Sequence, residues 1–203
     1  LEDSIERAEL RQTIMQILGE AISRDIEEVA VNGDTASVDP FLAKFNGILK
    51  QATSNIVDAG VTSLNKTIFR DMLRAMPSEF LRNKAAMKFI TSVDAEIDYR
   101  DSVSDRATVL GDTLLAQEAP VTYSGIPLVD CQLFPENLGV GSNCTNVIFT
   151  DPKNINFGLW RNIRIETDKL VSEGVLIIVA TLRFDVKYAE ETAVAKAINV
   201  KVA

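Results

Sequence analysis

The residues best placed to do chemistry are four aspartates in the middle of the chain. They are Asp94, Asp98, Asp101 and Asp105. On a helix this spacing puts them on one side, where paired carboxylates could bind a divalent metal or act as general acid and base. Arg100 and Arg106 lie among them, and such mixed charge runs are more typical of a solvated helix face. We expect the solvated face, and a metal-dependent enzyme that uses these carboxylates is the alternative.

Composition excludes most other catalytic arrangements. The chain has 0 His, so it can form no Ser-His-Asp triad, no Cys–His dyad and no His-bound zinc site. Its 2 cysteines, Cys131 and Cys144, are too few for a four-thiolate zinc site. We expect two free thiols, since a disulfide would require their backbones to approach closely. Gly139-Val140-Gly141 is too short for a dinucleotide fingerprint and predicts a turn. We therefore expect no catalytic residue, metal or cofactor.

The charge pattern offers one further candidate surface. With 21 basic and 29 acidic residues the net charge is -8, which makes the chain a poor general binder of nucleic acid. Lys66, Arg70 and Arg74 nevertheless form a basic stripe at i, i+4 and i+8 of one predicted helix. A solvated helix face is the simpler interpretation, and contact with DNA or with an acidic partner surface is the alternative.

The first half of the chain is predicted to be mainly helical. Residues 1–31 carry apolar side chains at helical spacing, and Asn32-Gly33 predicts a left-handed end. Such a helix would span about 45 Å, longer than a compact domain of about 100 residues, so it must support other elements or pack against a neighbour. Further helices are expected at residues 41–52, at 62–76 with Thr62 or Ser63 as cap, and at 92–105, with a strand at 86–92.

The second half is predicted to consist of short strands separated by Gly and Pro. The expected strands are residues 123–130, 145–150, 155–160, 163–167, 174–186 and 193–202. The first half of the 174–186 strand is apolar on both faces, which predicts burial. Helices followed by strands, without strict alternation, indicate an α+β class, and 203 residues fit one large domain or two small ones. No window approaches the length of a membrane span.

Five phrases, in order along the chain, resemble the major capsid proteins of tailed bacteriophages, which share the Hong Kong 97-type shell fold. Residues 20–34 resemble the end of that family's spine helix and its Asn-Gly-Asp turn. Residues 39–52 resemble the segment leading into its axial domain, and residues 69–90 its helix, Met-Pro stop and next strand. Residues 106–111 with Gly125-Ile126-Pro127, and residues 183–200, resemble its later phrases.

The resemblance implies an α+β chain with two domains. Residues 1–37 and 159–190 would form a peripheral domain with the spine helix and long strands. Residues 38–158, with 191–203, would form a mixed axial domain. The family places an N-terminal arm and an extended loop before the spine helix, and we expect both to be absent because this chain starts at that helix. No crosslinking residue is therefore carried over.

The implied function is structural. Pentamers and hexamers of a major capsid protein would form an icosahedral shell around double-stranded viral DNA, touching it by weak non-specific contacts. Portal and scaffolding proteins would be further partners, no membrane would be involved, and the protein would reside in the virion after assembly in the host cytoplasm. The alternatives are an encapsulin-type nanocompartment shell, which shares the fold, and a small monomeric binding module.

Four residues are candidates for the assembly interface. They are Arg70, Arg74, Trp160 and Arg183. The ends of the spine helix and the loops around residues 111–145 are the candidate regions, because closed shells reuse the same surfaces under symmetry.

Overall fold

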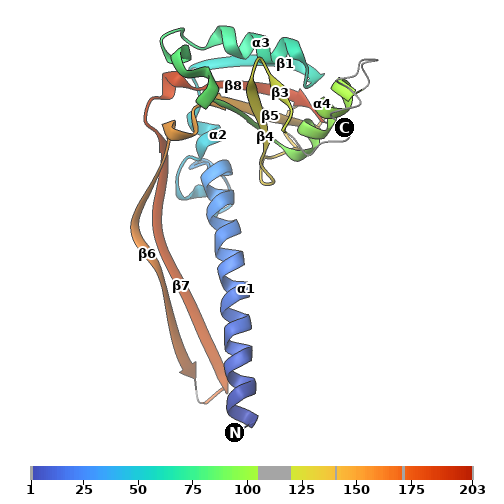
Figure 1. Ribbon diagram of the computed structural model, residues 1–203. Helices are drawn as coiled ribbons and strands as arrows, with labels where there is room; N and C mark the ends of the chain where they lie inside the picture. The colour runs from blue at the N-terminus through green and yellow to red at the C-terminus, as the bar shows by residue number, and fades with distance from the viewer. Residues whose placement is uncertain (1, 105–119, 140, 171, 203) are drawn as a thin grey trace.

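The computed structural model describes residues 2–104, 120–139, 141–170 and 172–202. The chain divides into a sheet domain and an extended region (Figure 1). The extended region consists of one long helix and one long β-hairpin, which project from the sheet domain in the same direction. The sheet domain holds the remaining helices and strands.

The long helix α1 (Glu2–Asn32) confirms the helix predicted over residues 1–31. Its last turn closes when the Gly33 amide donates to the Val29 carbonyl at 2.9 Å. The predicted left-handed end is wrong, because Gly33 is not among the residues with positive φ. Glycine is required there for another reason. A Cβ at Gly33 would lie 2.4 Å from the Phe45 carbonyl and 2.6 Å from the Val29 carbonyl.

A tight junction follows α1, where one helix was predicted over residues 41–52. The structure has instead a 3-10 turn at Leu42–Lys44 and a short helix α2 (Ile48–Gln51), separated around Gly47. The Gly47 amide donates to the Gly33 carbonyl at 2.8 Å. A Cβ on Gly47 would lie 2.6 Å from the Val31 carbonyl, so two glycines let two backbones touch.

The sheet domain is built on a mixed six-stranded sheet with the strand order β1-β8-β5-β2-β4-β3. Its strands are β1 (Asn55–Ser63), β2 (Lys88–Thr91), β3 (Thr122–Tyr123), β4 (Ile126–Asp130), β5 (Cys144–Thr150) and β8 (Ala195–Lys201). The pairs β1–β8 and β2–β4 are parallel and the others are antiparallel. Strand β1 was not predicted from the sequence.

Three segments cover the sheet or connect its strands: α3 (Lys66–Ala75), the 3-10 segment Phe80–Ala86 and α4 (Val93–Ser104). The predicted helix over 62–76 begins too early, because Thr62 and Ser63 pair with β8 as part of β1. Asn65 is the actual cap, since its side-chain oxygen accepts from the Thr67 and Ile68 amides. Helix α4 begins as predicted, with Ser92 Oγ accepting from the Ala95 amide at 3.4 Å.

The core lies on both faces of this sheet. On one face Phe69 of α3 has its ring centroid 4.6 Å from Phe89 and 4.9 Å from Tyr99 of α4. On the other face Ile148 packs with Ile48 and Leu49 of α2 and with Val186 at the base of the hairpin. Adjacent residues Ile148 and Phe149 belong to opposite layers, as strand alternation requires. This second layer anchors the extended region.

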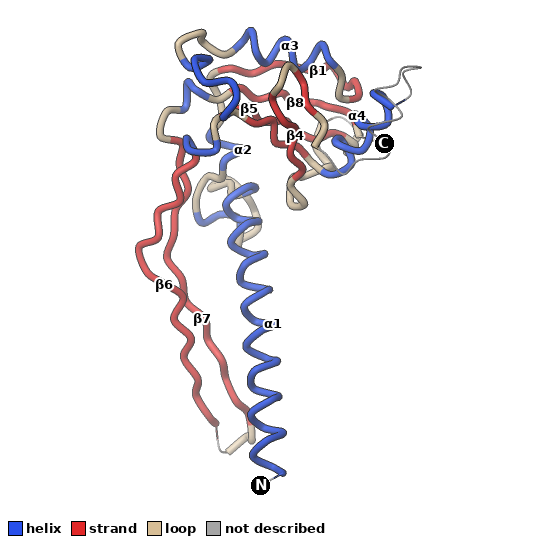
Figure 2. The backbone as a smooth tube through the Cα atoms, viewed as in Figure 1, coloured by secondary structure: helices blue, strands red, loops and turns tan. Residues whose placement is uncertain are grey.

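The hairpin consists of β6 (Ile155–Leu170) and β7 (Val175–Tyr188), which pair only with each other among the described residues. Two strands predicted at 155–160 and 163–167 are thus one strand (Figure 2). Register shifts between Leu159 and Arg161, and between Arg161 and Arg164, interrupt the pairing. The prediction that β7 begins in a buried environment is wrong for this chain, because Ile177 and Val179 are 38% and 46% exposed.

Candidate functional site

The extended region leaves an unusual amount of apolar surface in contact with solvent. Exposed large apolar side chains occur along both α1 and the hairpin. They are Ile14, Ile17, Phe157, Leu159, Trp160, Ile163, Ile165, Leu170, Ile177 and Val179. Single exposed apolar residues are ordinary, whereas their concentration in one region makes that region a candidate interaction surface.

Strand alternation gives the hairpin two different faces. Phe157, Leu159, Leu182 and Phe184 share the face toward α1, where Phe157 stacks on Phe184 with centroids 5.2 Å apart. Phe184 also meets the edge of Phe45 at 5.1 Å, which ties the hairpin to the junction after α1. The apolar face thus packs well only near the sheet domain.

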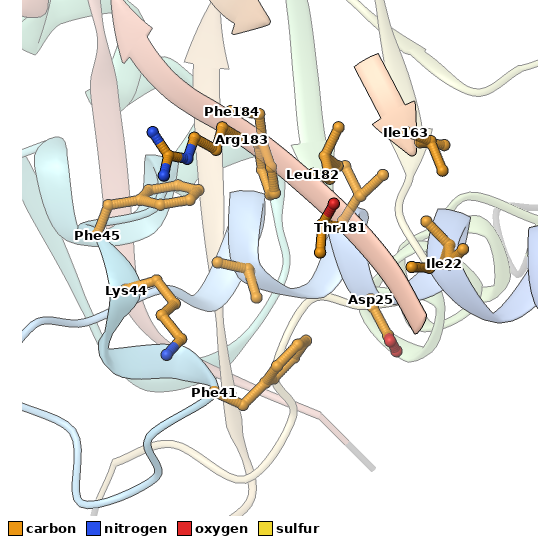
Figure 3. Close-up of a pocket in the computed structure, with 13 residues that line it drawn as sticks. Ile22, Asp25, Phe41, Lys44, Phe45, Ile163, Thr181, Leu182, Arg183 and Phe184 are labelled. Atoms are coloured by element: carbon orange, nitrogen blue, oxygen red, sulfur yellow. The ribbon is translucent and has the colours of Figure 1, made fainter. Parts of the chain in front are cut away.

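An apolar groove of about 440 Å³ lies between α1, the hairpin and the segment around residues 41–45 (Figure 3). We call it the arm groove. Its apolar lining residues are Ile22, Ile26, Val29, Phe41, Phe45, Ile163, Ala180, Leu182 and Phe184. Its polar lining is Asp25, Lys44, Thr181 and Arg183. An apolar groove with few charged groups has the make-up of a protein-binding site.

Trp160 lies beside this groove and not in it. Leu159 pairs with Phe184 and Arg161 with Arg183, so Trp160 is the extra residue of a β-bulge. Its side chain is 86% exposed. Bulges commonly re-aim a side chain, and here the bulge presents the single tryptophan of the chain to solvent.

Two positively charged side chains lie beside Trp160 in the hairpin. Arg161 and Arg183 stand directly opposite each other in the two strands, an arrangement that is unfavourable for like charges. Neither arginine forms an ion pair within the described ranges of the chain. The nearby pairs Arg164–Glu166, at 3.0 Å, and Lys187–Asp185, at 3.8 Å, are exposed and contribute little.

The four interface candidates fall into two groups. Trp160 and Arg183 come together around a shallow hollow in the hairpin, which Gly158 and Asp185 also line. Arg70 and Arg74 lie instead on the exposed side of α3 in the sheet domain. Arg70 Nε donates to Asp71 Oδ1 at 3.0 Å, and this hydrogen bond raises the pKa of Arg70.

The aspartate cluster does not assemble a metal site among the residues described. No group of three or more His, Cys, Asp or Glu could hold a metal there, and Asp105 lies outside the described residues. Burial, followed by the charges of Asp94 and Asp101, raises the pKa of Asp98. Glu96 on the same helix accepts from Arg100 at 2.6 Å, the ion pair of an ordinary helix face.

The cysteines are free thiols, as expected. Burial raises the pKa of Cys131 to about 11, and its Sγ donates to Glu27 on α1 at 3.5 Å. Cys144 is fully buried in β5. Gly139 and Gly141 have positive φ in the turn before β5, while Val140 lies outside the described residues. Neither thiol is therefore a candidate nucleophile.

Sequence reasoning missed one polar site that fixes the end of the hairpin. The Glu191 carboxylate accepts from the amides of Thr53 at 2.6 Å and Ser54 at 2.8 Å, and from the Ser54 hydroxyl. Partial burial raises the pKa of Glu191, but these hydrogen bonds outweigh it, so the pKa is lowered overall. The partners are 137 and 138 residues away, and no local pattern reveals them.

The exposure of Ile177 and Val179 was also missed, because the apolar first half of the strand predicted at residues 174–186 was expected to be buried. The available signal was that the beginning of β7 is apolar on both faces, which a two-stranded hairpin cannot bury.

No helix in the described ranges combines the length and hydropathy needed to cross a bilayer.

Comparison with known proteins gives a consistent result. The model of the phage capsid family matches residues 2–198. YqbE of Bacillus subtilis (strain 168), whose name describes a prophage capsid protein, is 42% identical over 205 residues that cover 99% of this chain and 66% of the relative. The chain thus spans slightly less than two thirds of the length of that curated relative.

Solved structures share the fold at low identity. The procapsid of satellite phage P4, described with its size determination protein, matches with a TM-score of 0.68 at 13% identity, covering 95% of this chain and 64% of that one. The capsid of an empty GTA particle matches with a TM-score of 0.66 at 14% identity, covering 94% of this chain and 66% of that one. The SrpI encapsulin of Synechococcus elongatus PCC 7942 matches with a TM-score of 0.63 at 14% identity, covering 93% of this chain and 65% of that one. The structural similarity shows a Hong Kong 97-type fold. The family model, which matches nearly the whole chain, shows that the chain belongs to the phage capsid family.

Proposed function

We propose that this chain is the body of a major capsid protein, copies of which assemble into an icosahedral shell enclosing double-stranded viral DNA. The observation that carries the proposal is the uncovered apolar surface of the extended region, in a chain of the phage capsid family. Pentamers and hexamers of the protein would be the building units.

The physical argument is that the extended region is incomplete as a solitary structure. A two-stranded hairpin is marginally stable alone and normally needs further strands or packing partners. Each large apolar side chain moved from water into an interface contributes about 1.5–3 kcal/mol before the costs of association. Neighbouring subunits would supply that cover, with the arm groove as apolar centre and its charged residues as rim.

The two regions support a division into the domains of such shells. Residues 1–37 and 159–190 would form the peripheral domain, and residues 38–158 with 191–203 the axial domain. The extended region would correspond to the first of these and the sheet domain to the second (Figure 1). Arg70 and Arg74 would then contribute to contacts between axial domains. Charge reversal at both positions that left assembly unchanged would remove them from the interface.

Partners and location follow from the same proposal. The protein would assemble in the host cytoplasm and remain in the virion, with portal and scaffolding proteins as further partners. The net charge of -8 favours weak, non-specific contact with the enclosed DNA. The role is structural and non-catalytic.

An encapsulin-type shell is the second candidate, because an encapsulin shares this fold. Its 14% identity supports the architecture alone, whereas the 42% identical relative carries the name of a prophage capsid protein. The contents of the shell distinguish the two functions, since one encloses DNA and the other encloses cargo enzymes.

The deciding experiment is expression of the complete natural gene product, followed by negative-stain electron microscopy and nuclease treatment. We expect closed shells or rings, and we expect shells formed in phage-producing cells to protect double-stranded DNA. Shells that hold protein cargo and no DNA would support the nanocompartment instead. Persistent monomers, even with the neighbouring scaffolding gene co-expressed, would contradict both.

A further inference from the structure

We propose that an acidic face on α4 of one subunit binds a basic surface at the opposite end of the sheet domain in a second copy of this chain. The inference rests on the proposed shell function, and it names the two surfaces that would join neighbouring sheet domains. The acidic face consists of Asp94, Ile97, Asp98 and Asp101 of α4, together with Glu136. The basic surface consists of Arg74, Arg82 and Lys84.

The acidic face is the side of α4 that the sheet domain leaves uncovered. Its helical positions are three and four residues apart and share one side of the helix, whereas Ala95 and Tyr99 are buried in the core. Asp94 and Asp101 are exposed, and Ile97 between them leaves 47% of its surface in water. An apolar side chain framed by carboxylates agrees with the layout of an interface, which has an apolar centre and a polar rim.

Negative charge accumulates at the start of this helix. Glu136, from the loop after β4, accepts a hydrogen bond from the Asp94 amide at 3.2 Å and so adds a further carboxylate to the face. Arg100 is the only basic residue in the sequence of α4, and it forms an ion pair with Glu96 at 2.6 Å. The carboxylates of the acidic face are therefore in excess over the cations of the helix.

Mutual repulsion among these carboxylates is visible at Asp98. Burial comes first, and the charges of Asp94 and Asp101 then raise the pKa of Asp98 further, although Lys201 acts in the opposite direction. Like charges three and four residues apart destabilise a helix, so the acidic face costs the isolated subunit some stability. Cations supplied by another molecule would relieve this cost.

The basic surface lies where α3 ends and the following 3-10 segment begins. Its three side chains are exposed and form no ion pair in the part of the chain that the structure describes. Within residues 66–88, Asp71 and Glu79 are the only acidic side chains, and Asp71 is already paired with Arg70 at 3.0 Å. Positive charge is thus concentrated here, in a chain whose net charge is -8.

The two surfaces lie too far apart to pair within one subunit. In Figure 1, α4 lies at one end of the sheet domain, while the end of α3 and the green 3-10 segment after it lie at the other. A second copy would match both surfaces, whereas DNA would match the basic surface alone. A contact between two different surfaces is heterologous and closes into a ring when the rotation allows, which suits pentamers and hexamers. Opposite charge would also orient the subunits as they meet.

Carbodiimide crosslinking tests the contact in the unaltered protein. The reagent couples a carboxylate to a lysine amine where the two groups touch. In rings or shells of the full-length protein we expect Lys84 to be linked to Asp94, Asp101 or Glu136, and in disassembled subunits we expect no such link. Assembled particles in which Lys84 is linked elsewhere, or is not linked at all, would overturn the proposal.

Charge reversal on either surface should impair assembly. Arg82→Glu with Lys84→Glu reverses the basic surface, and Asp94→Lys with Asp101→Lys reverses the acidic face. Because each change sets like charges against each other, we expect each double variant to weaken assembly at least about tenfold. Lys153→Glu, at an exposed cation of the 3-10 turn before β6, is the control for added negative charge and should assemble normally.

All four substitutions in one chain give the sharpest test, because the reversed surfaces match each other again. We expect this variant to recover most of the lost assembly, a rescue that only paired surfaces produce. Melting temperatures of the disassembled subunits must match that of the parent. If the two lysines on α4 lower it, Asp94→Asn with Asp101→Asn should weaken assembly in the same direction.

The outcomes separate this inference from the shell function. Reversed variants that assemble normally, or a fourfold variant without rescue, overturn the contact while the parent still forms shells. Normal shells that lose only their protection of DNA would assign the basic surface to DNA and would overturn it as well. Parent subunits that never assemble would instead contradict the proposed shell function.

Discussion

The sheet domain and the extended region use the same kinds of residue for opposite purposes. In the sheet domain Phe69, Phe89 and Phe149 are fully buried and touch one another through ring contacts. In the extended region Phe157 and Leu159 are each 49% exposed and Trp160 is 86% exposed. The comparison indicates that apolar side chains form the core of the sheet domain but stay partly exposed in the extended region, where the proposed shell function would have neighbouring subunits cover them.

The largest effect on subunit stability is expected in the sheet domain. Phe69→Ala should lower the free energy of unfolding by about 3–5 kcal/mol, because it leaves a cavity among Phe89, Tyr99 and Tyr123. The matched variant in the extended region, Phe157→Ala, should cost less than about 1 kcal/mol since its ring is already half in water. Urea unfolding of disassembled subunits measures both, and equal losses would break the comparison.

The next largest effect is expected at the junction that joins the two regions. Gly33→Ala should cost about 1–3 kcal/mol, because the added Cβ meets backbone carbonyls that cannot move independently. The control is Gly19→Ala, where a Cβ meets nothing within 4 Å. That variant should stabilise α1 by up to about 1 kcal/mol, so thermal unfolding should move in opposite directions. A stabilised Gly33→Ala subunit would show that the junction is not close-packed.

The sequence predicted the sheet domain and the extended region to different extents. The long helix over residues 1–31 and the start of the helix predicted at residue 92 follow from local rules and were correct. Strand β1 was missed because its apolar and polar residues do not alternate in sequence, although half-buried and exposed side chains alternate over its first six residues, and because its partner β8 lies at the other end of the chain. Local pattern does not encode pairing across such a distance.

The candidate site was predicted only in part, for a physical reason. Trp160 and Arg183 were chosen from the sequence, and the hairpin brings them together through pairing. The exposed Ile177 and Val179 were expected to be buried, since apolar residues look alike whether their partner is the same chain or another. The spacing of apolar residues in the sequence does not show whether the same chain or another molecule covers them.

A smaller, pH-dependent effect is expected where β7 returns to the sheet domain. Glu191→Gln should lose about 1 kcal/mol at neutral pH, because a neutral amide accepts more weakly from Ser54 and Thr53. The pKa of Glu191 is lowered in the folded state, so its contribution is complete above the ordinary value of 4.5 and is lost as pH falls through the lowered pKa.

Urea unfolding of the parent and Glu191→Gln between neutral pH and about pH 3 tests this linkage. The two curves should converge as the pH falls below 4.5. Glu190→Gln is the control, because its carboxylate contacts only the nearby Thr192 hydroxyl in the hydrogen bonds of the described residues. A constant difference between parent and Glu191→Gln at all pH values would mean that the carboxylate charge is not what holds the segment.

The smallest effect on the subunit is expected at the far part of the hairpin. Ile177 and Val179 lie on the same face of β7, with 38% and 46% of their surfaces exposed. Replacing both by Thr keeps branched side chains that suit a strand, so the free energy of unfolding should change by less than about 0.5 kcal/mol. Assembly should nevertheless fail or require much higher protein concentration, because the cover from a neighbour is lost.

This pair of measurements separates the two roles most directly. Sedimentation and electron microscopy of the double variant should show folded subunits without shells, while Val38→Thr, at a side chain exposed to 99%, should assemble normally. If the double variant unfolds, the far hairpin contributes to subunit stability and the two regions are not independent. If it assembles like the parent, the contact with the neighbour does not depend on Ile177 and Val179, and their exposure has another reason.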